Sequence, residues 1–161
     1  MPANWNGIAM IQGRRKNIRL SKETYQMPSQ IFSFTICTWN RHPLFQNETW
    51  SRLVLTSLGT GPIGEKTDRY AYCLMPDHLH LLLSPKESNL VDLINQWKSF
   101  SANLLRENGV EGPCWQRAFY DHALRKEEDI RGVAEYIVNN PVRSGIVTNW
   151  VDYPFSWHRW M

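Results

Sequence analysis

The sequence predicts an α+β fold built on one antiparallel sheet, and two observations lead to that prediction. Apolar and β-branched side chains alternate along short stretches near residues 31–38, 69–75, 78–84 and 118–124, as they do in half-buried strands. Apolar residues recur with a helical period near 48–58, 90–107 and 127–139. The order strand, helix, strand, strand, helix, strand is that of the ferredoxin-like fold (βαββαβ), with its helices on one face of the sheet, and the last helix is a C-terminal addition.

The first strand and helix follow from local composition. Residues 31–38 are rich in β-branched and aromatic side chains, and Phe32, Phe34 and Ile36 would share one face of the sheet. Asn47 or Thr49 can cap the helix that follows, because their side chains accept hydrogen bonds from its first free N–H groups. The glycine-rich run at 59–64 ends that helix.

The hairpin that follows carries the residues with most chemical interest. Pro76 and Asp77 join its two strands, and side chains on a strand alternate between faces. One face of the second strand carries only leucines, Leu79, Leu81 and Leu83. The other face then carries His78 and His80. Two imidazoles at this spacing beside a carboxylate are typical of a metal site, although two surface histidines on a half-solvated sheet would give the same pattern.

The predicted helix at 90–107 has an apolar stripe and one lysine outside it. The stripe comprises Leu90, Leu93, Ile94, Trp97, Phe100, Ser101, Leu104 and Leu105. Lys98 falls off the stripe, so it would be either a solvated side chain or a contact for a phosphate. Gly109 and the Gly-Pro pair at 112–113 end the helix.

The last predicted helix, at 127–139, places one tyrosine away from its core face. Its core stripe comprises Ile130, Val133, Ala134, Ile137 and Val138. At roughly 100° per residue, Tyr136 points away from the centre of this stripe, on the side of Asn140. A tyrosine packed against a neighbouring loop would show the same pattern, so helix geometry alone leaves its role open.

Composition limits the class of protein. A chain of 161 residues with 42% hydrophobic residues and eight tryptophans is typical of a folded domain rather than a disordered one. The formal net charge of +3 permits a nucleic-acid partner. Three scattered cysteines without a C-x-x-C pair are typical of reduced thiols in a cytoplasmic protein. No apolar run is long enough to span a bilayer, and we expect no membrane partner.

We expect two regions, a basic N-terminal arm at 1–28 and a single domain at 29–161. The arm is polar and weakly patterned, and it would be either solvated or in contact with DNA phosphates. The candidate phosphate contacts are Arg14, Arg15, Lys16 and Arg19 in the arm and Lys98 in the domain.

Several motifs resemble those of one family. Residues 76–80 (Pro-Asp-His-Leu-His) are similar to the His-hydrophobic-His motif of the single-tyrosine (HUH) nucleases. Residues 119–125 (Phe-Tyr-Asp-His-Ala-Leu-Arg) and 135–145 (Glu-Tyr-Ile-Val-Asn-Asn-Pro-Val-Arg-Ser-Gly) resemble the REP-associated tyrosine transposases, relatives of small insertion-sequence transposases. The runs at 43–45, 97–99, 115–116 and 153–156 also fit, so the resemblance extends from about Ser29 to the C-terminus.

This resemblance implies a ferredoxin-like, metal-dependent transposase that cleaves and rejoins single-stranded DNA beside a hairpin formed by a palindromic repeat. In that reaction a tyrosine attacks a phosphodiester, becomes a 5′-phosphotyrosine and releases a 3′-hydroxyl. Carried onto this chain, the resemblance implies Tyr136 as the nucleophile, with His78, His80 and Asn140 as ligands of Mg²⁺ or Mn²⁺. It also implies a monomer or homodimer that acts on DNA of the nucleoid.

Two other functions would use the same residues differently. A metal-dependent hydrolase with water as its nucleophile would need both histidines but not Tyr136. A non-catalytic module for single-stranded nucleic acid would stack bases on aromatic side chains and tolerate the loss of both histidines. Two other tyrosines lie near the site in sequence, and we assign Tyr72 to packing and Tyr120 to structure or DNA contact.

Overall fold

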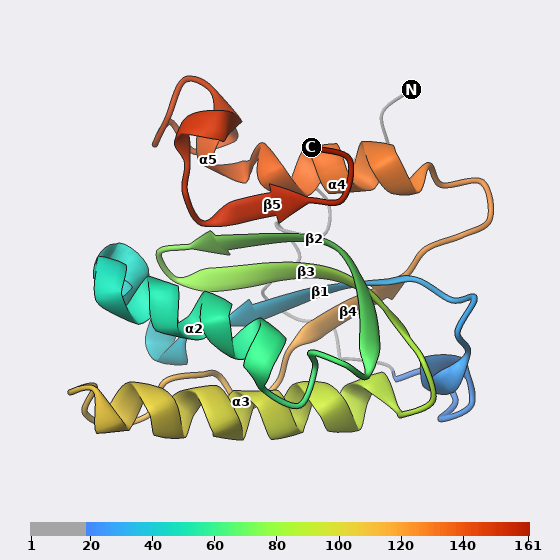
Figure 1. Cartoon of the computed structure of the whole chain (residues 1–161), viewed down its shortest axis with the longest axis horizontal. Helices are drawn as coiled ribbons and strands as arrows, with labels where there is room; N and C mark the ends of the chain where they lie inside the picture. The colour runs from blue at the N-terminus through green and yellow to red at the C-terminus, as the bar shows by residue number, and fades with distance from the viewer. Residues whose placement is uncertain (1–18) are drawn as a thin grey trace.

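The computed structural model describes residues 19–161, which form a five-stranded antiparallel sheet in the order β4-β1-β3-β2-β5 (Figure 1). Its strands are β1 (Phe32–Cys37), β2 (Thr67–Met75), β3 (His78–Pro85), β4 (Tyr120–Ala123) and β5 (Ser156–His158). β1 and β3 lie side by side at the centre. This arrangement confirms the predicted ferredoxin-like order of the first four strands.

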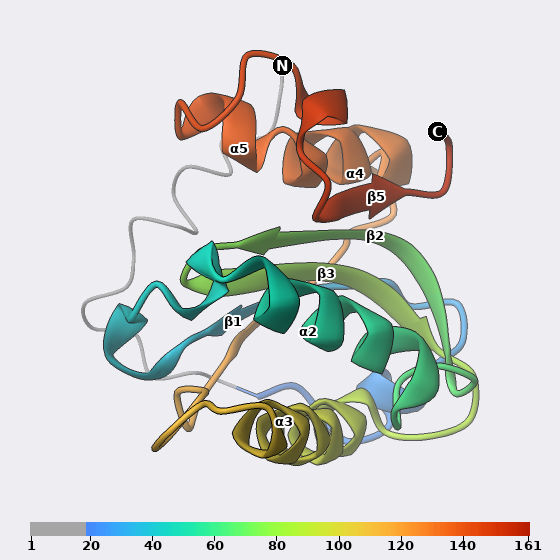
Figure 2. The same ribbon diagram turned by 60° about the vertical axis from the view of Figure 1, so that its left-hand side comes forward.

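The helices lie on both faces of the sheet. α2 (Glu48–Thr60) and α3 (Leu90–Glu107) pack on one face, whereas α4 (Ile130–Val138) packs on the other and continues into the short α5 (Asn140–Arg143). Figures 1 and 2 show the sheet between these two layers. The connecting 3₁₀ turns are η1 (Thr24–Gln26), η2 (Trp39–Arg41), η3 (Leu44–Gln46) and η4 (Trp150–Asp152). The additional helix therefore covers the face opposite the two helices of the ferredoxin-like unit.

Alternation along β3 builds a separate core on each face. Leu79, Leu81 and Leu83 are fully buried under α2 and α3, as the leucine pattern predicts. Leu82 points to the opposite face and packs under Val133 of α4. His78 and His80 share the face of Leu82, because side chains two residues apart on a strand point the same way. The two histidines therefore lie on the α4 side of the sheet.

The structure differs from the prediction at both ends of α4. The helix begins at Ile130 rather than near 127, because the Asp129 carboxylate caps it by accepting the N–H groups of Arg131 and Gly132. Pro141 lies at the start of a new helical turn, α5, where its missing N–H costs no hydrogen bond. β5 was not predicted at all, because three residues are too short for a periodic signal.

The part of the expected N-terminal arm that the structure describes packs onto the domain. Tyr25 is only 2% exposed, and its ring stacks on Phe32 with 5.0 Å between ring centres. Its hydroxyl donates a hydrogen bond of 2.7 Å to Asp121 on β4. The phosphate contacts predicted at Arg14, Arg15 and Lys16 lie outside the described residues.

The cysteines and the lengths of the helices can be described directly. Cys37, Cys73 and Cys114 are all buried free thiols. From residue 19 onward, no helix combines the length and the hydropathy that crossing a membrane requires.

Candidate active site

The two histidines of β3 point their outer nitrogens at each other. The Nε2 atoms of His78 and His80 are 3.1 Å apart, and the rings stand at 90° with 4.7 Å between their centres. The strand repeat produces this convergence, because it places both side chains on one face two residues apart. The two imidazoles are therefore directed at one point, as the sequence predicts for a metal site.

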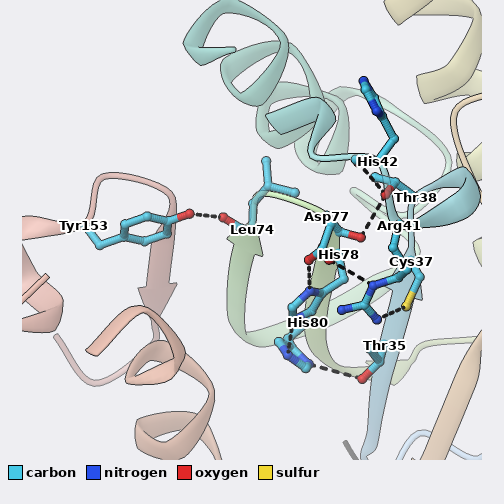
Figure 3. Close-up of polar contacts among 10 residues, drawn as sticks. All are labelled: Thr35, Cys37, Thr38, Arg41, His42, Leu74, Asp77, His78, His80 and Tyr153. Atoms are coloured by element: carbon cyan, nitrogen blue, oxygen red, sulfur yellow. Dashed lines mark hydrogen bonds and ion pairs between the residues drawn. The ribbon is translucent and has the colours of Figure 1, made fainter. Parts of the chain in front are cut away.

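Each inner nitrogen has a partner that orients its ring. His78 Nδ1 lies 2.6 Å from the Asp77 carboxylate, and His80 Nδ1 lies 3.1 Å from the Thr35 hydroxyl on β1 (Figure 3). Arg41 Nε in turn donates to the other Asp77 oxygen at 2.9 Å. Such outer partners fix the tautomer and the ring direction of metal-binding histidines.

Electrostatics favours a neutral His80 and an ionised Asp77. Burial, followed by the charges of His78, Arg143 and Arg41, holds the pKa of His80 well below its usual value of 6.5. Burial alone would raise the pKa of Asp77, but hydrogen bonds and charge from His78 and then Arg41 lower it to about 2. His80 is therefore in the unprotonated form that binds metals at neutral pH, beside a permanent negative charge.

The histidine pair opens into a pocket of about 330 Å³ on the α4 side of the sheet. Tyr136 from α4 and Asn140 from α5 line the same pocket as His78 and His80. The side-chain nitrogen of Asn140 donates to the Ile137 carbonyl at 2.8 Å, and this bond fixes the plane of the amide. The structure therefore brings together all four residues that the sequence predicts for catalysis and metal binding.

Arg143 is a member of this site to which the sequence analysis assigns no role. Its guanidinium lies over the Tyr136 ring at 3.6 Å from the ring centre and donates to the Tyr136 backbone carbonyl at 2.7 Å. A cation at this distance is attracted by the ring and restrains it. The contact spans seven residues across the break between α4 and α5, and Arg143 lies beyond the predicted end of the helix at residue 139.

The residues present fit a divalent cation. Neighbouring ligands of one ion at about 2.1 Å are about 3.0–3.4 Å apart, and the two Nε2 atoms match that spacing. If both Nδ1 atoms donate to their oxygen partners, the two Nε2 lone pairs face each other, and a cation between them removes their repulsion. Within residues 19–161, no set of three or more His, Cys, Asp and Glu side chains is placed to hold an ion, so further ligands must be of another kind. The amide oxygen of Asn140 is one such group on the same pocket.

Lys98 does not line this pocket. It is 9% exposed, and its ammonium donates to the carbonyls of Gln116 and Arg117 at 2.6 and 2.8 Å. This arrangement favours a role in holding the 116–117 loop on α3 over the expected phosphate contact.

Arg19 is also held inside the domain. Its guanidinium forms an ion pair with Asp121, which lines the pocket, and lies 4.2 Å from the centre of the Phe119 ring. Binding to a phosphate would therefore compete with an internal partner of Arg19.

Comparison with known proteins identifies the family of this chain. Residues 26–140 match the family model described as "Transposase IS200 like". The chain belongs to this transposase family. The match ends at Asn140 and therefore includes both histidines and Tyr136 of the pocket.

Two curated relatives carry the same kind of name. An Escherichia coli REP-associated tyrosine transposase is 32% identical over 90 residues, covering 55% of this chain and 53% of that protein. A Haemophilus influenzae protein provisionally given the same name is 32% identical over 104 residues, covering 55% of this chain and 58% of that protein. The chain thus matches only a little over half the length of either relative.

A solved structure of a REP-associated tyrosine transposase bound to a REP hairpin has the same fold. It superposes with a TM-score of 0.67 at 22% identity, over 88% of this chain and 82% of the other. Together with the strand order, this similarity supports the α+β architecture predicted from the sequence.

Proposed function

We propose that this protein is a single-tyrosine DNA endonuclease and transposase, which cleaves and rejoins single-stranded DNA through a covalent 5′-phosphotyrosine on Tyr136. The observation that carries the proposal is the shared pocket, in which Tyr136 lies with His78 and His80, whose Nε2 atoms converge to 3.1 Å. Membership of the IS200-like transposase family supports the same reaction. A structural tyrosine would have no need of a converging histidine pair in its pocket.

His78, His80 and the amide oxygen of Asn140 would hold the divalent ion. Mg²⁺ prefers oxygen ligands, whereas Mn²⁺ accepts imidazole more readily, so a set of two imidazoles and one amide suits Mn²⁺ and admits Mg²⁺. When bound, the ion supplies Lewis-acid stabilisation of the charge that develops on the phosphate. Asp77 and Thr35 keep the imidazoles directed at the ion through their bonds to Nδ1.

The reaction exchanges one phosphate ester for another. The phenol oxygen of Tyr136 attacks phosphorus as its proton leaves, the bond from phosphorus to O3′ breaks, and O3′ takes up a proton. The phosphate stays on the 5′ end of one DNA segment, joined to Tyr136, and the other segment ends in a free 3′-hydroxyl. Attack by a 3′-hydroxyl on the phosphotyrosine reverses the step and rejoins DNA, with no external energy source.

Arg143 would position Tyr136 in this step. Its stacked guanidinium restrains the phenol ring, and its charge lies near the pocket in which the phosphate would bind. Arg41, which also lines the pocket, holds Asp77 and thereby His78.

The DNA partner we propose is a hairpin with a single-stranded flank. The support is the solved relative of the same fold, which is bound to a REP hairpin. The basic residues Arg14, Arg15 and Lys16 are proposed to contact its phosphates.

Trapping the covalent intermediate tests the nucleophile. The wild-type protein is incubated with an end-labelled hairpin oligonucleotide and Mn²⁺ or Mg²⁺, and the adduct is read on a denaturing gel. Tyr136→Phe should form no adduct and bind DNA within about twofold of wild type, because binding rests on phosphate contacts. Tyr120→Phe is the matched control, since Tyr120 lines the same pocket from β4 and should still form the adduct.

The histidine variants test the proposed metal site. His78→Ala and His80→Ala should lose the adduct while retaining DNA binding, and chelation of divalent ions should have the same effect in wild type.

DNA found on Tyr120 by peptide mapping would reject the assignment of Tyr136. Cleavage that survives in Tyr136→Phe would show that water is the nucleophile.

A further inference from the structure

A second pocket lies beside the active site, and one loop forms part of both. The loop at 38–42 contributes Arg41 to the histidine pocket. The same loop contributes Trp39, Asn40 and His42 to a separate pocket of about 370 Å³. Trp50 of α2 and Glu111, which follows α3, also line this second pocket.

The backbone of this loop directs successive side chains into different pockets. Asn40 and Arg41 have φ values of 52° and 55°, the left-handed region that residues with side chains rarely adopt. Two such residues in succession turn the chain sharply. Figure 3 shows the result, with Arg41 directed toward Asp77 and His42 pointing away from the histidine pair.

The loop is tied directly to the turn that precedes His78. The Thr38 hydroxyl donates to the carbonyls of His42 at 2.7 Å and Asp77 at 3.0 Å, and the Thr38 N–H donates to Asp77 at 2.9 Å. Trp39 N–H donates to the Cys114 carbonyl at 3.0 Å, which holds the other side of the loop. The second pocket therefore has a fixed position relative to the histidines, as a subsite for one substrate strand requires.

The lining of the second pocket suits a flat, uncharged ring with a hydrogen-bond donor. Trp39 is 45% exposed, so its indole offers a face for stacking. Trp50 is anchored, because its indole N–H donates to the Asn108 carbonyl at 3.0 Å. Among residues 19–161, the lining includes the carboxylate of Glu111 and no lysine or arginine. A carboxylate without a cation disfavours a phosphate and accepts a hydrogen bond from an exocyclic amino group.

We infer that the second pocket binds one unpaired nucleobase of the strand whose phosphate lies at the histidine pair. The base stacks on Trp39, and its amino group donates to Glu111, which favours adenine, cytosine or guanine over thymine at that position. The phosphate would then lie on the side of the loop that carries Arg41, and the base on the side that carries Trp39. This inference rests on the proposed function, because it takes single-stranded DNA as the substrate.

Abasic scanning tests the subsite by binding, without requiring cleavage. A fluorescent hairpin with a single-stranded flank is prepared as a series in which each flank nucleotide in turn lacks its base, and affinity is measured by anisotropy. In wild type one position should weaken binding about tenfold, the usual loss for one stacked base. Trp39→Ala should weaken the intact strand equally and show no further loss at that position, whereas Trp39→Phe should restore most of the affinity.

Two further variants separate the subsite from general effects. Phe100→Ala removes an aromatic side chain of similar exposure on α3 that lines neither pocket, and its scan should match wild type. Glu111→Gln should reduce the preference for an amino-bearing base over thymine at the sensitive position.

The outcomes also distinguish the two proposals. A wild-type scan with no sensitive position, or a Trp39→Ala scan identical to wild type, overturns the subsite even if the Tyr136 adduct forms. Position-specific binding that depends on Trp39, in a protein that forms no adduct, supports the subsite and overturns the nuclease reaction. A wild-type protein that does not bind single-stranded flanks overturns both.

Discussion

The Tyr136 ring has a guanidinium on one face, and the pair crosses the break between α4 and α5. The Arg143 charge lies 3.6 Å from the ring centre and lowers the pKa of His80 after burial and His78. Burial lowers the pKa of Arg143 itself, yet a guanidinium is so strong a base that it stays charged at neutral pH. Arg143 is thus a positive charge against the proposed nucleophile, and it is near enough to a proposed metal ligand, His80, to lower that residue's pKa.

Replacing Arg143 should therefore slow chemistry more than binding. We expect Arg143→Gln to reduce the rate of adduct formation about tenfold, since a partly buried cation–π contact is worth about 1–2 kcal/mol. Arg143→Lys should recover part of that rate because it keeps the charge. The rate is measured by quenching the reaction at successive times and reading the adduct on a denaturing gel.

Arg159→Gln is the matched control for that experiment. Arg159 lies 4.3 Å from the centre of the Tyr70 ring, a similar contact outside the histidine pocket. Its removal should leave the rate of adduct formation unchanged. Equal rates in Arg143→Gln and wild type would reject a role for Arg143 in the reaction.

The sequence predicted the histidine pair because strand alternation has a period of two and needs no tertiary information. The roles of Tyr136 and Asn140 were predicted from helix geometry and family resemblance together, and both residues line the histidine pocket. Arg41 and Arg143 were missed for different reasons. Arg41 lies in a loop whose left-handed backbone angles no periodic pattern predicts, and Arg143 lies in α5, beyond the predicted end of the helix at residue 139.

At the scale of elements, α3 shows where periodicity fails. The predicted bounds of 90–107 agree with the structure, because Asn89 caps the helix and the apolar stripe is long. Phe100 belongs to the apolar pattern yet is 40% exposed, while Lys98 lies off the stripe and is buried. The 116–117 loop crosses Lys98, and no helical pattern predicts which side of a helix a distant loop will cover.

The burial of Lys98 should make stability depend on alkaline pH. Burial and then the charge of Arg19 lower its pKa from 10.5 to about 8. The folded state then binds fewer protons than the unfolded state between those values, so this group adds stability as pH rises through that window. At about 1.4 kcal/mol per pKa unit, the upper limit is about 3 kcal/mol.

Denaturant unfolding of wild type and Lys98→Met at pH 7, 8.5 and 10 measures this effect. The difference in unfolding free energy should shift in favour of wild type as pH rises. Lys86→Met, at an exposed lysine, is the control and should show a constant difference. A constant difference for Lys98→Met as well would mean that its ammonium keeps its proton in the folded state.

At the scale of the whole molecule, one face of the sheet carries the main core and the other carries the histidine pocket. α2 and α3 pack on one face and form the larger of the two core clusters with it. α4 covers the other face over β2 and β5 and leaves a pocket above β1, β3 and β4. Tyr136, His78, His80 and Asn140 all line that pocket.

DNA binding by the whole protein should depend steeply on salt. Each phosphate of a single strand that a cation neutralises contributes about 0.7 to the slope of log affinity against log salt. Replacing Arg14, Arg15 and Lys16 together by glutamine should therefore reduce that slope by about 2. Anisotropy titrations from 50 to 300 mM salt provide the measurement. An unchanged slope would exclude these three residues as phosphate contacts.

The support of α4 by β5 has a consequence for the order in which the site forms during synthesis. Synthesis of the histidine hairpin is complete at residue 85, whereas the Tyr136 helix follows about fifty residues later and packs against β5, at Ser156–His158. Domains tend to fold from their N-terminal side as they emerge. A nascent chain can therefore complete its histidine pair well before the helix that bears the tyrosine is held in place. The group that would react with DNA is then the last to be positioned, so translation itself delays any strand breakage by unfinished protein.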